Sequence, residues 1–265
     1  MKRALMVSVP FQVFLILAGL VIVAGCTKAI EGEKITTPPP IEQAQGVAIA
    51  PFIAEMAEKL GRWVPIRVAE NFDLKFKNAD KDIQFVYDQS KSVNPVASKL
   101  EEMGVTLNHM FEDSALAAKV GRELNANLIV VGKLDEPTFA RKDYNTLLQR
   151  LGRQAGISGS ATFVRTRLSA YMRAWIKVID TNSGQLIFND SIRGYIKYWY
   201  AYQTEQRRQV TFKTDSEMEA DLGKHLSRRI AHALDPIGMP DIKEGEVLMT
   251  PTVTLKGNQG VIQWD

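Results

Sequence analysis

The chain has 265 residues, of which 45% are hydrophobic, and a formal net charge of +3. Loss of the two basic residues near its start, Lys2 and Arg3, leaves about +1, which gives no electrostatic argument for nucleic-acid binding. The only cysteine is Cys26, so no disulfide and no thiolate metal site can form within the chain.

The first 26 residues have the layout of a secretory signal. A basic start precedes an apolar run over 7–24, which ends in Val-Ala-Gly-Cys at 23–26. The run is near the length that crosses a bilayer, so an uncleaved transmembrane anchor is the alternative. The segment 23–26 resembles the lipobox of bacterial lipoproteins. That resemblance implies cleavage between Gly25 and Cys26, a diacylglycerol on the thiol, and an acyl chain on the new amino group. In a bacterium with two membranes it further implies a periplasm-facing place on the outer membrane.

Residues 26–45 are predicted to form a lipidated, flexible tether. The stretch is polar and contains Thr-Thr-Pro-Pro-Pro at 36–40, a composition typical of extended, disordered linkers. We expect one folded domain over 46–235. The extension 236–265 is expected to form a terminal hairpin or tail, which either packs on the domain's own sheet or serves as a partner-binding arm.

The first half of the domain is predicted to mix short strands and helices. A buried strand is expected at 46–52, a short helix at 53–60 closed by Gly61, and a half-buried strand where Phe72, Leu74 and Phe76 alternate with charged residues. A further strand is expected at 83–87. A helix follows at 95–103, with proline at its start and Gly104 as its stop.

The second half gives stronger patterns. A helix capped by Asp113 or Ser114 runs to Asn125, and 128–132 is a continuous apolar run typical of an inner strand. Apolar residues alternate from Leu168 to Val178, and the turn sequence Asp-Thr-Asn-Ser-Gly at 180–184 predicts a hairpin with a return strand. A last helix is expected at 216–234, with acidic residues near its start and basic residues toward its end.

This order of elements resembles a known group of envelope proteins. The segments that carry the resemblance are Val-Ala-Ile-Ala-Pro-Phe at 47–52, Ala-Asn-Leu-Ile-Val-Val-Gly at 126–132, the hairpin around 178–186 and the C-terminal helix. They are similar to the curli-secretion channel lipoproteins, to the lipoproteins that activate penicillin-binding proteins and, more distantly, to the amino-terminal domain of TolB. The resemblance implies an α/β (α+β) sandwich with a mixed, largely antiparallel sheet flanked by helices. It also implies a non-enzymatic protein that binds protein partners or assembles into rings.

We find no pattern of residues that predicts catalysis. The three histidines, His109, His225 and His232, have no cysteine or carboxylate at zinc-site spacing. The glycines at 152, 156 and 159 fit neither a phosphate loop nor a dinucleotide fingerprint, and a flexible loop is expected there. We therefore predict no catalytic residue, no metal, no small-molecule substrate and no cofactor other than the lipid on Cys26.

One aromatic cluster stands out as a candidate interface. Three interpretations remain open for it: the rings pack a sheet edge, form a protein interface, or lie at a membrane surface. Its members are Tyr195, Tyr198, Trp199, Tyr200, Tyr202, Arg207 and Arg208.

The membrane interpretation connects this cluster to the channel lipoproteins. In that family, two insertions flanking the hairpin become membrane strands, and they correspond here to 136–165 and 192–213. A membrane strand needs about ten residues of alternating polarity. Only one limb of 192–213 offers them, and 144–151 reads as a helix. The leading hypothesis is therefore a lipid-anchored, non-catalytic binding or assembly module for an envelope protein partner or the cell wall. The alternative is an oligomeric secretion channel.

Overall fold

The computed structural model describes residues 33–78, 83–87, 94–145, 163–203 and 210–237. The chain divides into two compact units, 1–34 and 35–265, and the fold below is that of the second. Several sequence predictions lie outside the described residues. They are the signal over 1–25 with its cleavage site Gly25–Cys26, the glycine-rich loop, Arg207 and Arg208, and the extension beyond residue 237.

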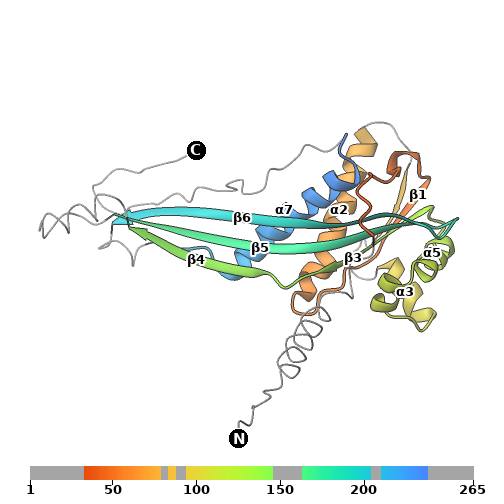
Figure 1. Cartoon of the computed structure of the whole chain (residues 1–265), viewed down its shortest axis with the longest axis horizontal. Helices are drawn as coiled ribbons and strands as arrows, with labels where there is room; N and C mark the ends of the chain where they lie inside the picture. The colour runs from red at the N-terminus through yellow and green to blue at the C-terminus, as the bar shows by residue number, and fades with distance from the viewer. Residues whose placement is uncertain (1–32, 79–82, 88–93, 146–162, 204–209, 238–265) are drawn as a thin grey trace, which may run out of the picture. The chain divides into compact units, whose positions relative to one another are not determined.

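Six described strands form one mixed sheet (Figure 1). The first strand, β1, pairs in parallel with β2 and β3, whereas β5 pairs antiparallel with β3, β4 and β6. The predicted α/β class with a mixed, largely antiparallel sheet is therefore confirmed. The bounds are β1 Gly46–Ile49, β2 Gln84–Val86, β3 Leu128–Leu134, β4 Thr138–Asn145, β5 Phe163–Asp180 and β6 Leu186–Gln203.

Two strands share one edge of β5. Strand β3 pairs with the end of β5 up to the partners Leu134 and Ala174, and β4 resumes the pairing at Thr138 opposite Tyr171. The break between them contains Pro137, which has no N–H to donate to the ladder. The sheet thus continues beyond β3 as a three-stranded extension, which we call the arm: residues 138–145, 163–173 and 193–203.

Helices cover both faces of the sheet where β1 and β3 lie, but the two layers differ in extent. Helices α2 and α7 pack on one face and share its core with β5 and β6, as far as the arm. The short helices pack on the opposite face against β1 and β3. The bounds are a 3-10 turn η1 Ile41–Gln43, α2 Glu58–Asn78, α3 Pro95–Glu102, α4 Leu107–Glu112, α5 Ser114–Glu123 and α7 Asp215–Leu234.

The segment 58–78 corrects two predictions, because one helix replaces both the short helix ending at Gly61 and the strand around Phe72. Val64, Val68 and Phe72 recur every four residues and are fully buried, so helical spacing wins over the local alternation. Pro65 lies inside this helix and cannot donate to the carbonyl of Gly61. That carbonyl instead accepts the N–H of Phe52 at 2.8 Å.

The domain also begins earlier than the sequence indicated. Ile35 forms a two-way backbone pair with Asn189 of β6, and Ile41 is only 1% exposed, within the core. The proline run between them connects these contacts, and Pro39 is itself buried. The second half of the predicted tether 26–45 therefore packs on the domain, and residues 27–34 alone separate Cys26 from the first strand contact.

Other predicted boundaries are confirmed by their caps. The Asp113 carboxylate accepts the N–H groups of Ala115 and Leu116 at the start of α5, and Asn125 ends that helix with φ +55°. The helix expected at 144–151 is corrected at its start, since Tyr144 lies in β4. In the part of the chain that the structure describes, no helix is long and apolar enough to cross a membrane.

Candidate functional site: two faces of the arm

The predicted aromatic cluster is split between the two faces of β6. Successive side chains of a strand point to opposite sides. Tyr198, Tyr200 and Tyr202 are 0%, 1% and 3% exposed on the face that α7 covers. Tyr195 and Trp199 are half-buried on the other face. The cluster is therefore divided between the two sides of the arm. We call the side that α7 covers the covered face, and the opposite side the open face.

The covered face is part of the hydrophobic core. Ile196 and the three buried tyrosines pack with α7, where Leu222 and Leu226 are fully buried. The backbones approach closely at Gly194, where a Cβ atom would lie 3.1 Å from the Cβ of Leu226. For these tyrosines the interpretation as sheet packing is the one observed. These three side chains are covered by α7, so this side of β6 does not present an exposed apolar face.

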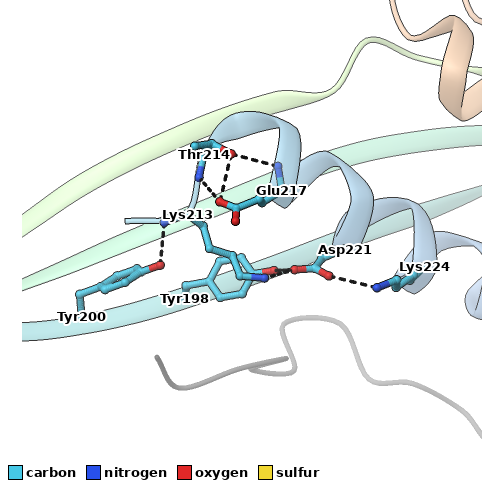
Figure 2. Close-up of polar contacts among 7 residues, drawn as sticks. All are labelled: Tyr198, Tyr200, Lys213, Thr214, Glu217, Asp221 and Lys224. Atoms are coloured by element: carbon cyan, nitrogen blue, oxygen red, sulfur yellow. Dashed lines mark hydrogen bonds and ion pairs between the residues drawn. The ribbon is translucent and has the colours of Figure 1, made fainter. Parts of the chain in front are cut away.

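A carboxylate on α7 ties the covered face together (Figure 2). The Tyr198 hydroxyl donates to Oδ2 of Asp221 at 2.6 Å, and the Lys213 ammonium pairs with the same oxygen. The Lys224 ammonium lies 3.7 Å from Oδ1. Burial alone would raise the pKa of Asp221, but the bonds from Lys213 and Tyr198 hold that pKa below its usual value. Burial and the bond to Asp221 raise the pKa of Tyr198.

The start of α7 fixes the position of these groups. Thr214 and Glu217 form a capping box, in which each residue's backbone N–H donates to the other's side chain, at 2.8 and 3.3 Å. Directly before it, the backbone N–H of Lys213 donates to the Tyr200 hydroxyl at 3.0 Å. Burial raises the pKa of Tyr200. The helix therefore enters in a fixed register against β6.

The third buried tyrosine belongs to a second polar chain. The Tyr202 hydroxyl lies 3.0 Å from Oγ1 of Thr166, which donates to Asp143 at 2.6 Å. The rings of Tyr200 and Tyr202 also contact Phe212, with centroids 4.9 and 5.8 Å apart. These contacts bridge β4, β5, β6 and the segment before α7. Their effect is structural, because each hydroxyl is satisfied within the fold.

The register of β4, β5 and β6 brings the residues of the open face side by side. Lys142 and Tyr144 of β4 lie opposite Arg167 and Arg165 of β5, and these lie opposite Trp199 and Ala201 of β6. Nearer the body, Tyr171 faces Tyr195. The open face comprises Lys142, Tyr144, Arg165, Arg167, Tyr171, Arg193, Tyr195, Lys197 and Trp199.

Basic groups lie over the rings at the far end of the open face. The Arg165 guanidinium is 5.0 Å from the ring centroid of Trp199, and that of Arg167 is 5.9 Å from the same centroid. The Tyr144 ring lies 5.5 Å from Trp199, with the Lys142 ammonium 5.2 Å from its centroid. Cations stack favourably on aromatic faces at these distances. The charges are thus held in place without being neutralised.

Five basic residues of the open face form no ion pair with any described residue: Lys142, Arg165, Arg167, Arg193 and Lys197. The Nε of Arg167 is buried and has no hydrogen-bond partner. At the base of the arm the situation differs, because Asp135 accepts from Trp175 at 3.0 Å and lies 4.0 Å from Arg173.

Closer to the body, the short helices take over this side of the sheet. The Lys177 ammonium donates to the carbonyl of Phe111 in α4 at 2.9 Å and lies 4.3 Å from its ring centroid. Burial lowers the pKa of Lys177. Among the described residues, packing of the helices α3–α5 on this side reaches Trp175 and stops there. The open face therefore begins where this helical layer ends.

Sequence reasoning found Tyr195 and Trp199 but missed their partners on β4 and β5. The missing residues are Lys142, Tyr144, Arg165 and Arg167, which lie far from residue 199 in sequence. The alternation of Arg165 and Arg167 with buried residues was the available signal. Among the described residues, no group of three or more histidine, cysteine, aspartate and glutamate side chains could hold a metal ion.

Comparisons with known proteins find similar solved structures but no matching family. No protein-family model matches the chain, and no curated protein matches its sequence. The fold is similar to the PelC dodecamer from Paraburkholderia phytofirmans, at 11% identity and a TM-score of 0.34, covering 78% of this chain and 97% of that one. It is also similar to lipoprotein GNA1162 from Neisseria meningitidis, at 8% identity and 0.32, covering 67% and 92%.

A third similar structure is the LpoB C-terminal domain from Salmonella enterica, at 9% identity and a TM-score of 0.25, covering 66% of this chain and 87% of that one. Likeness at these identities concerns the fold alone. One of these similar structures is itself described as a lipoprotein.

Proposed function

We propose that this chain is a lipid-anchored, non-catalytic binding or assembly module of the cell envelope. Diacylglycerol and an N-acyl chain on Cys26 hold it to a membrane. In a bacterium with two membranes, this is the outer membrane, with the domain facing the periplasm. Its role is to present a folded domain at the membrane surface to an envelope protein partner or to the cell wall.

The observation that carries the proposal is the short connection to Cys26. Ile35 is paired to Asn189, and residues 27–34 are the part of the chain between Cys26 and this pair. Even fully extended, the chain from Cys26 to Ile35 spans at most roughly 30 Å. A lipidated Cys26 therefore keeps the domain within reach of the bilayer, as a surface-held module requires.

The polar cluster on α7 supports a role without catalysis. Acid–base catalysis works best with groups whose pKa lies near the working pH. In the cluster around Asp221 the pKa of the carboxylate is lowered and that of Tyr198 is raised, so both move away from neutrality. The cluster therefore fixes α7 on β6, and neither Asp221 nor Tyr198 is poised to exchange a proton at neutral pH.

Acylation of Cys26 is the first experimental test. Metabolic labelling with palmitate, followed by intact mass measurement, should give a mature chain that begins at Cys26 and carries three acyl chains. The Cys26→Ser variant should remain unlabelled and keep its signal. A native protein that begins at Met1, or equal labelling of the variant, would contradict the proposal.

Partner binding is tested separately in native membranes. Photocrosslinkers placed at exposed helix positions, such as Lys119 of α5 and Arg228 of α7, should give discrete adducts from one side of the domain. Adducts from neither position, or the same adduct pattern from both, would argue against a specific partner. Native mass measurement in detergent tests self-association, since a discrete ring would favour the channel alternative.

A further inference from the structure

We propose that the open face of the arm docks flat against an anionic lipid bilayer, the same membrane that holds the anchor. The inference rests on the proposed acylation of Cys26. It names one binding partner of the domain, phospholipid headgroups, and so decides which side of the domain remains available to other partners.

Charge is the first argument. Lys142, Arg165, Arg167, Arg193 and Lys197 share the open face and form no ion pair with a described residue. Each basic side chain close to an anionic bilayer strengthens binding by roughly five-fold. The attraction fades over about one Debye length, roughly 8 Å at physiological salt, so the face must lie close to the headgroups. Because the five basic side chains lie on one surface, all of them can approach the headgroups at the same time.

The shape and composition of the surface are the second argument. The open face spans three strands in width and runs from Arg193 to Ala201, roughly 27 Å along β6. Trp199, Tyr195 and Tyr144 are half-buried rather than protruding, and guanidinium groups lie over the ring of Trp199. Tryptophan, tyrosine and arginine are suited to headgroup level, where one part of the side chain is apolar and the other is wet. Such a face fits the plane of the phosphates and not the acyl core.

The length of the connection is the third argument. Residues 27–34 limit the distance between the anchor and Ile35 to roughly 30 Å. Ile35 is fixed to Asn189 on β6, the strand that also carries Arg193, Lys197 and Trp199. Tethering makes the encounter of this strand with the bilayer intramolecular, so even weak headgroup contacts suffice to orient the arm.

A single-cysteine label tests the proposal on the acylated full-length mature protein. Since Cys26 is the only natural cysteine and its thiol carries lipid, Ala201→Cys gives one free thiol on the open side, and Ser216→Cys gives a control on α7. Each variant is labelled with a fluorophore and reconstituted into vesicles containing a headgroup-quencher lipid. Vesicles of phosphatidylcholine alone are compared with vesicles that also contain phosphatidylglycerol.

The label at Ala201→Cys should be quenched in phosphatidylglycerol vesicles and released by high salt, while the label at Ser216→Cys stays unquenched. Adding Arg193→Gln and Lys197→Gln should weaken docking by roughly 25-fold. The matched pair Lys59→Gln and Arg228→Gln removes the same charge from exposed positions of α2 and α7, on the opposite side of the sheet, and should leave quenching unchanged. Urea unfolding of both pairs checks that the fold is retained.

Each other outcome has a defined meaning. Intact mass is measured first, and an unacylated chain means that the proposed function has failed before docking is examined. An acylated chain whose Ala201→Cys label is unquenched, or is quenched equally in both vesicle types, overturns the docking proposal. Equal quenching at both label positions does the same. If the label at Ala201→Cys becomes buried only after an acidic envelope protein is added, the open face binds protein and the docking proposal is also overturned.

Discussion

The bond between Tyr198 and Asp221 offers a quantitative test of how α7 is held on the sheet. Asp221→Ala removes the acceptor of the Tyr198 hydroxyl and the ion-pair partner of Lys213. Tyr198 is fully buried, so its hydroxyl is left without a partner, at a cost of about 1–3 kcal/mol. The side chains of Asp221 and Lys213 are only 17% and 23% exposed, so loss of their pairing adds to this cost.

We expect Asp221→Ala to lower the free energy of unfolding by about 2–3 kcal/mol and the Tm by about 5–10 °C. The assay is urea unfolding of the mature protein in detergent, monitored by circular dichroism. An unchanged m-value shows that the variant changes stability and not the surface exposed on unfolding. The matched single variant is Tyr198→Phe, which removes only the hydroxyl. It should cost about 1.5 kcal/mol, because Asp221 keeps its bond with Lys213.

The double variant decides the interpretation. Once the carboxylate is gone, Tyr198→Phe removes an unsatisfied hydroxyl and should cost little further stability. The interaction energy of the cycle should therefore reach at least about 1 kcal/mol. If the two effects add to within about 0.5 kcal/mol, the bond contributes no coupling and the reasoning is refuted.

Three further predictions concern Tyr198, Gly61 and Thr214. The pKa of Tyr198 is raised above its unfolded value of about 10, so the stability that this shift provides is complete below about pH 10 and is lost as the pH rises. Between pH 9 and 11 the free energy of unfolding should therefore fall less steeply in Tyr198→Phe than in the wild type, by up to about 1.4 kcal/mol per pH unit. Gly61→Ala should destabilise by about 1–3 kcal/mol, although alanine favours helices, since its Cβ would lie 2.5 Å from the Phe52 carbonyl oxygen; a gain in Tm would contradict this. Thr214→Ala should cost about 1 kcal/mol through loss of the capping box with Glu217, measured by thermal unfolding, whereas an unchanged Tm would exclude a role for the cap.

Local patterns predicted the parts of this fold that local physics determines. The alternation from Leu168 to Val178 and the turn at 180–184 define the β5–β6 hairpin, because a sheet with one buried face imposes a period of two. Helix α5 could be bounded by Asp113 and Asn125, whose capping chemistry is local. The C-terminal helix was predicted for the same reason, since its apolar residues recur every four positions.

The failures have equally specific causes. The alternation of Phe72, Leu74 and Phe76 suggested a strand, yet the burial of Val64 and Val68 shows that the helical period over a longer window decides the structure. Gly61 was predicted to close a short helix, and Pro65 inside α2 cannot donate to the Gly61 carbonyl. Their cost is offset by one tertiary contact, the N–H of Phe52 on the Gly61 carbonyl, and such a contact is invisible in local sequence.

The candidate surface was half predictable. Period-two alternation along β6 separates Trp199 from Tyr198, but only the register of β4 against β5 brings Tyr144, Arg165 and Arg167 to Trp199. Register between distant segments depends on the whole sheet. The charged residues and Tyr144 are therefore brought to the open face by sheet topology, whereas Tyr195 and Trp199 could be found from the sequence of β6 alone.

The pairing of Ile35 with Asn189 has a mechanical consequence. Tension applied through the lipid loads the two backbone hydrogen bonds of Ile35, of 3.0 and 2.9 Å, before it loads the buried side chains of Pro39 and Ile41. Rupture of this pair releases the chain up to Pro39, whose extended length is at most roughly 14 Å, before the core is loaded. Under pulling, the N-terminal segment should therefore detach from the domain stepwise, before the hydrophobic core unfolds.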